Sequence, residues 1–208
     1  DYIDLLYRKR ITPKYSVEAN LSWAERRELT NNTNYKWVDR DKIEGYTPNA
    51  PVSLETPNTS FDTHQALIGS VALTARPWIK YRIRNGRKSE IDNSTPTMSM
   101  LYRKGFNKIL ASDIDFDQVE VGVKHSFKNG VRGRVDFNLR AGIFLNSDSL
   151  AFVDNKHFLG NRTPFSTTDP AGSFRLMDYY LYSTADKYFA ANVHYNFRRF
   201  LVTSIYEV

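Results

Sequence analysis

Strict alternation between apolar and polar residues, in several separate stretches, constrains the fold of this chain more than any other feature. Between Tyr15 and Trp23 the odd positions are apolar, whereas the even positions carry polar residues such as Glu18 and Asn20. The odd positions after residue 131 are again mostly apolar. A helix would mix the two kinds on each face, whereas a strand puts them on opposite faces. We therefore predict an all-β fold.

Eight segments carry this pattern or a weaker form of it, and all of them can pair as antiparallel neighbours. They are residues 2–8, 15–29, 64–84, 96–104, 116–127, a stretch from 131, 174–182 and 188–197. The runs from 15, 64 and 131 reach the roughly 9 to 11 residues of a tilted membrane strand, against about 5 to 6 in soluble sheets. The pattern predicts an antiparallel transmembrane β-barrel, with about eight strands present.

The connections between these segments differ in length. They are short to moderate near 12–13, 85–86, 129–130 and 184–186, and Asn129-Gly130 predicts a two-residue hairpin turn in which both residues accept positive φ. Longer ones, 30–62, 105–115 and 146–172, fall at every second junction. Long loops should therefore gather at one end of the sheet, as they do in outer-membrane barrels.

Composition is compatible with this prediction, although it does not require it. Charged residues make up 25% and the mean hydropathy is −0.52, values typical of soluble proteins. A membrane barrel can share them because only alternate residues face lipid, whereas the lack of a roughly 20-residue apolar run excludes a helical membrane protein. The net charge of +6 is dispersed, so we expect no nucleic-acid partner. The 14% aromatic content fits a membrane boundary or a Tyr-rich soluble sandwich.

The two ends of the sequence lead us to expect a single barrel region, residues 1–208, that is incomplete at both ends and belongs to a larger barrel. The start shows no signal-peptide pattern. The end, residues 205–208, is not the aromatic closing strand common in bacterial barrels.

The polar face of the predicted sheet is mostly basic. A charge that faces hydrocarbon costs about 2–4 kcal/mol at the bilayer midplane, so these side chains should line water or pair with one another. Two interpretations stay open: a lumen that guides an anionic solute or a polypeptide, and cross-strand ion pairs that hold the sheet together. The candidate lumen residues, which would share this face with Glu18, are Lys80, Arg82, Arg84, Arg103, Glu120, Lys124, Arg132, Arg134, Asp136 and Arg140.

The loop 146–172 is a second candidate site, because loops of this length are usually functional or disordered. It combines phenylalanines with turn-forming residues, and it could fill the lumen as a plug, cover the external mouth, or be a passive exposed loop. Its candidate residues are His157, Gly160, Asn161, Thr163 and Pro164.

No residue pattern indicates catalysis. The four histidines are far apart, and no zinc motif, acyl-nucleophile elbow or phosphate loop is present in the sequence. Asp113, Asp115 and Asp117 could gather Ca²⁺, although a solvated loop is the favoured interpretation. We therefore predict a protein that is not an enzyme and that has no cofactor and no metal.

Several segments resemble one known family. They are residues 96–106, 157–165, 174–180, 183–189 and 194–197. In order and spacing they resemble Bacteroidota outer-membrane proteins, uncharacterised and often named carboxypeptidase-regulatory-like domain-containing proteins. In that family a small β-sandwich precedes a C-terminal barrel that is distantly similar to the BamA/TamA assembly and translocation superfamily. The sandwich is absent from this sequence, and the family barrel continues past the position of Phe200.

The resemblance implies a bacterial outer-membrane location, the lipid bilayer as a partner, and a role in transport, translocation or assembly of envelope components. It implies no peptidase activity. Two alternatives remain from the residues themselves: a structural or adhesive surface barrel, and a soluble all-β binding domain.

Overall fold

The computed structural model describes residues 1–29, 32–33, 35, 37, 51–90, 95–130, 133–162 and 171–197. The predicted site residues Arg132, Thr163 and Pro164 lie outside these ranges. Among the described residues, no helix is long and apolar enough to cross a membrane.

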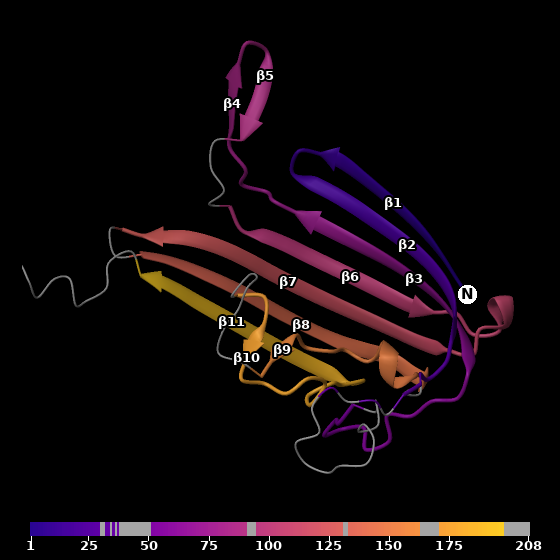
Figure 1. Cartoon of the computed structure of the whole chain (residues 1–208). Helices are drawn as coiled ribbons and strands as arrows, with labels where there is room; N and C mark the ends of the chain where they lie inside the picture. The colour runs from indigo at the N-terminus through magenta and orange to yellow at the C-terminus, as the bar shows by residue number, and fades with distance from the viewer. Residues whose placement is uncertain are drawn as a thin grey trace, which may run out of the picture.

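The fold is all-β, as predicted, and is dominated by one seven-stranded antiparallel sheet (Figure 1). Its strand order follows the chain: β1 (Tyr2–Thr12), β2 (Tyr15–Arg26), β3 (His64–Ala75), β6 (Thr97–Gly105), β7 (Asp115–Asn129), β8 (Gly133–Ser149) and β11 (Lys187–Phe197). The smaller elements are β4 (Tyr81–Arg84), β5 (Arg87–Glu90), β9 (Gly160–Asn161), β10 (Phe174–Arg175) and the 3₁₀ turns η1 (Ile109–Ala111) and η2 (Phe152–Asp154).

Seven of the eight predicted strands are present in this sheet, but two of the predictions need correction. The run predicted over 64–84 stops at Ala75, because Pro77 follows: proline has no N–H to donate to a strand ladder and restricts the residue before it. Residues 81–84 belong to a separate hairpin with β5. The strand predicted over 174–182 is reduced to β10, so β8 pairs directly with β11.

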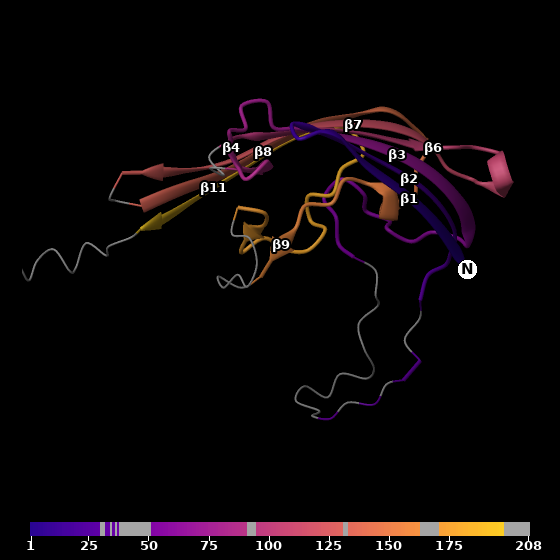
Figure 2. The ribbon, with the colours of Figure 1, turned by 90° about the horizontal axis from the view of Figure 1, so that it is seen from above.

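The sheet is strongly curved and open. Its described strands end with β1 at one edge and β11 at the other, and these two strands do not pair with each other. Figure 2 shows the curvature and the described parts of residues 150–186, called the inner segment below, lying on the concave side. The antiparallel all-β prediction is confirmed, whereas these seven strands do not form a closed barrel.

The connections are unequal at the two ends of the sheet. Residues 27–63, 106–114 and 150–186 join strands at one end, as predicted. At the other end, 13–14 is a short turn, whereas 76–96 is long because it contains the β4–β5 hairpin. Asn129 stays in β7 and pairs with Gly133, so the predicted two-residue turn at Asn129-Gly130 is wrong; of these two residues only Gly130 has positive φ.

The strand registers sort the side chains of the sheet into two faces. The convex face carries an apolar residue at the centre of every strand: for example, Leu21 of β2, Val71 of β3 and Val121 of β7, each more than 40% exposed. The concave face is mainly polar. A small core, Ala66, Ile68, Ile114, Phe116 and Phe144, lies on the concave side near the end with the long loops.

Candidate functional site

The concave face holds six of the predicted lumen residues. The registers place Arg103 on β6, Glu120 and Lys124 on β7, and Arg134, Asp136 and Arg140 on β8, all on the same side as Glu18 of β2. The prediction is wrong for Lys80, Arg82 and Arg84. Because the main strand ends before Pro77, Lys80 precedes the separate hairpin and the two arginines lie within it.

Asp154, at the end of η2 in the inner segment, is the central acidic group that contacts this face. Its side chain is 1% exposed and accepts from Arg26 Nη1 at 2.6 Å, while Arg103 Nη2 lies 3.9 Å from its other carboxylate oxygen. Arg103 also donates to the backbone oxygen of Asp154 at 3.4 Å. A buried carboxylate needs such partners, since removal from water without them is costly. Strands β2 and β6, which are separated in the sheet by β3, are thereby bound to the inner segment.

A second acidic group, Glu120, binds the inner segment through Lys156. Glu120 also accepts from the Tyr188 hydroxyl at 2.5 Å, and the Lys156 ammonium lies 5.2 Å from the centre of the Tyr188 ring. Tyr188 has room because Gly142 is its neighbour on β8: a Cβ at that position would collide with the phenol ring. The packing therefore depends on a glycine and an aromatic residue on adjacent strands.

Gln118 joins the two acidic groups into one network. Its side-chain oxygen accepts from Arg103 Nη1 at 2.9 Å, and its amide nitrogen donates to the Tyr188 hydroxyl at 3.1 Å. Gln118 is 2% exposed, so both bonds are shielded from water. We call this set the inner network; it crosses the sheet from β2 to β11 and consists of Arg26, Arg103, Gln118, Glu120, Asp154, Lys156 and Tyr188.

His157 makes contacts within the inner segment that hold its parts together. Its Nδ1 lies 2.7 Å from Ser183 Oγ, and its ring packs 5.1 Å from Phe152 and 5.1 Å from Tyr180. Burial is the main cause that lowers the pKa of His157 below its ordinary value, which favours the neutral ring. Ser183 is fully buried, so this pair is placed for packing and not for attack on a substrate.

The remaining part of the inner segment also contacts the concave face. Asn138 Nδ2 donates to the Ala171 oxygen at 3.2 Å, and Asn192 Nδ2 donates to the Ser173 oxygen at 3.4 Å. Gly160 and Asn161 form β9, which pairs in parallel with β10. Residues 146–149 of the predicted loop 146–172 belong to β8, so the loop begins later than predicted. Its other described residues include some that contact the polar face, and its role stays a prediction.

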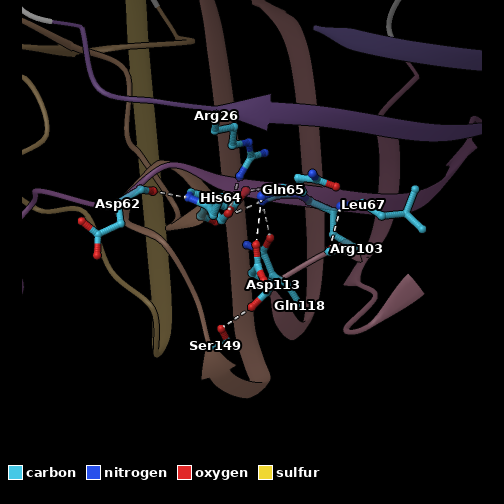
Figure 3. Close-up of polar contacts among 11 residues, drawn as sticks. Arg26, Asp62, His64, Gln65, Leu67, Arg103, Asp113, Gln118 and Ser149 are labelled. Atoms are coloured by element: carbon cyan, nitrogen blue, oxygen red, sulfur yellow. Dashed lines mark hydrogen bonds and ion pairs between the residues drawn. The ribbon is translucent and has the colours of Figure 1, made fainter. Parts of the chain in front are cut away.

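A further polar cluster lies at the start of β3, at the end of the sheet with the long loops (Figure 3). Asp113 accepts from the Gln65 backbone N–H at 3.0 Å, and Ser149 Oγ donates to the Asp113 backbone oxygen at 2.6 Å. Asp115 and Asp117 have other partners, Asn146 and the Tyr102–Lys104 pair. Among the described residues, no group of three or more potential ligands could hold a metal ion.

The concave face carries an ion pair across neighbouring strands, as one of the two interpretations predicted, and an ion pair within one strand. Arg8 and Glu18 pair across β1 and β2 at 2.7 Å, and Arg134 pairs with Asp136 on the same strand at 2.9 Å. Arg140 is exposed on this face. The more buried pairs, however, join the sheet to the inner segment, which neither interpretation had included.

One known family model matches the sequence over residues 1–208. It is described as the C-terminal domain of a family of unknown function (DUF5686). The chain belongs to this family. No curated protein and no solved structure matches it. The likeness to the BamA/TamA superfamily stays a prediction.

For this DUF5686 domain, sequence reasoning missed five members of the inner network. Arg26, Gln118 and Tyr188 could have been found, because each lies on the polar face of its strand by the alternation. The other missed members are Asp154 and Lys156. No pattern in the sequence relates Asp154 to Arg26, since their contact joins positions far apart in the chain.

Proposed function

We propose that this domain forms part of the wall of a bacterial outer-membrane β-barrel, with the convex face toward lipid and the inner segment in the lumen. The observation that carries the proposal is the convex face itself. Its central positions are apolar in all seven strands, and each strand exposes at least one large apolar side chain on this face: Leu5 is 61% exposed and Val193 is 70% exposed. Such an extended exposed apolar surface marks a membrane or a large interface.

The positions of charges and aromatic rings on the convex face support a membrane. Charged residues of this face, such as Lys9, Glu25, Lys104, Asp117 and Lys187, lie at or near strand ends. On β2, Tyr15 and Trp23 flank the smaller apolar residues between them. Outer-membrane strands have the same arrangement, because aromatic rings favour the interfaces and charges are costly at midplane depth.

The two open edges of the described sheet, at β1 and β11, also have to be explained in a membrane. In lipid every backbone polar group must be satisfied, so a membrane sheet has to close. We propose that further strands, pairing at the edges of β1 and β11, complete the barrel. The role assigned to it is transport, translocation or assembly of envelope components, with an anionic solute or a polypeptide as the substrate class and no catalytic activity.

Two other functions give different experimental results. A soluble all-β binding domain would stay in the soluble fraction, whereas an outer-membrane barrel fractionates with the outer membrane and migrates faster on a detergent gel before heating. Recovery of the full-length protein from the soluble fraction, with no heat-dependent change in migration, would refute the proposal. The apolar face would then be assigned to a protein interface.

A structural or adhesive surface barrel would insert in the membrane but would conduct no ions. In planar bilayers we expect a transport barrel to conduct once the inner segment is loosened by Lys156→Met, which removes the cation bound to Glu120. Arg134→Gln combined with Arg140→Gln should then lower the anion preference of that current. A current that is absent in every variant would favour the structural or adhesive role.

A further inference from the structure

The β4–β5 hairpin places three arginines on one of its faces. In its register Arg84 lies directly opposite Arg87, and Arg82 lies opposite Ser89, so these four side chains share a face. The turn between the strands is tight, with positive φ at Asn85 and Gly86. The arginines are therefore held close together by backbone pairing.

This arrangement is unfavourable for the hairpin alone. Like charges directly opposite each other destabilise a strand pair, and Ser89 offers no negative charge. Within the part of the chain that the structure describes, the three guanidinium groups have no acidic partner, and all three residues are exposed. An anionic ligand would remove the repulsion between the guanidinium groups. The relief of this repulsion would add to the free energy of binding.

The position of the hairpin indicates where such a ligand would be. The hairpin projects beyond the end of the main sheet, away from the inner segment (Figure 1). Its base is tied to the β1–β2 turn by a hydrogen bond from the Arg76 N–H to the Lys14 oxygen at 2.8 Å. Trp78 beside it is 59% exposed. Tryptophan at the end of an apolar band is typical of a membrane–water interface.

We propose that the Arg82, Arg84 and Arg87 face of the β4–β5 hairpin binds the phosphate groups of anionic lipids at the adjacent membrane surface. The inference rests on the proposed barrel, which puts a bilayer beside the hairpin. Guanidinium groups suit this ligand, because their planar fork can donate two parallel hydrogen bonds to phosphate oxygens. Each cation near an anionic surface adds to the attraction.

The test uses the full chain in lipid nanodiscs. The sequence contains no cysteine, so Ile83→Cys, on the other face of the hairpin, gives a single site for an environment-sensitive fluorophore. We expect its emission to shift to the blue as phosphatidylglycerol replaces phosphatidylcholine. Arg84→Gln with Arg87→Gln should weaken this response about fivefold for each charge removed.

The matched control also removes two positive charges from the same region of the chain. Lys80→Gln with Lys88→Gln leaves the arginine face intact and should have a smaller effect. An equal effect of the two double variants would overturn the assignment to that face. If glycerol phosphate shifts the emission equally in neutral nanodiscs, the ligand is a soluble phosphate compound and not a lipid.

The outcomes also separate this inference from the proposed function. A chain that inserts, as shown by heat-dependent migration, but whose emission ignores lipid charge contradicts the lipid site alone. A chain that does not insert contradicts the barrel, and with it the lipid site.

Discussion

The convex and concave faces of the seven-stranded sheet differ in how specific their interactions are. Leu21 and Val121 on the convex face are exposed and are suited to any apolar surroundings. On the concave face Gln118 and Asp154 are nearly inaccessible, and each has defined hydrogen-bond partners. The convex face therefore requires only an apolar kind of residue, whereas the concave face requires particular residues.

The largest effect should follow from a charge on the convex face. Leu21→Arg puts a guanidinium group at the middle of β2, where the cost in lipid is about 2–4 kcal/mol. We expect little of the heat-modifiable, membrane-inserted form on detergent gels. The control is Ser22→Arg, the next residue, which faces the concave side opposite Asp4. If both variants insert equally well, the convex face does not contact lipid.

A smaller effect should follow from loss of the buried carboxylate on the concave face. Asp154→Asn leaves Arg26 and Arg103 without their negative partner, and loss of a hydrogen bond to a charged group costs about 1.5–3 kcal/mol. We expect faster amide hydrogen exchange in residues 150–162, with the β7–β8 ladder still protected.

The matched control for this variant is Asp178→Asn. Asp178 pairs with Arg162 at 2.7 Å, but both side chains are more than half exposed, so the pair contributes little. Equal exchange in the two variants would show that Asp154 does not hold the inner segment.

Gly142→Ala tests the close contact between adjacent strands. The new methyl group would collide with the Tyr188 ring and displace its hydroxyl from Glu120, at a cost of about 1–3 kcal/mol. We expect a lower unfolding midpoint in urea. Tyr188→Phe should cost less in the Gly142→Ala background than alone, because the hydroxyl bonds are already broken. Additive costs would mean that Tyr188 does not depend on Gly142.

The sequence predicted the two faces well, because alternation is a local property. The alternation along each strand placed Glu120 and Arg134 on the polar side, and the strand registers agree. It did not predict that a proline would separate Arg82 from the sheet, because the apolar and basic alternation continues across that break. It also missed the ion pair between Arg26 and Asp154. Which loop residue meets which strand depends on how the long loops fold back, and the chain pattern does not contain that information.

The smallest effect should come from pH, through His157. Burial holds the pKa of this ring below its ordinary value of about 6.5, so the folded segment favours neutral His157. Its contribution to stability is complete above about pH 6.5 and is lost as the pH falls through the lower, folded-state pKa. Backbone hydrogen bonds with Val153 and Phe152 oppose this lowering of the pKa, as does Asp154, whereas Arg103 adds to it. Hydrogen exchange of residues 150–162 should therefore quicken below pH 6.5, once corrected for the intrinsic pH dependence of exchange. In His157→Gln, which keeps a neutral polar group near Ser183, this extra quickening should disappear; if it persists, the titrating group is not His157.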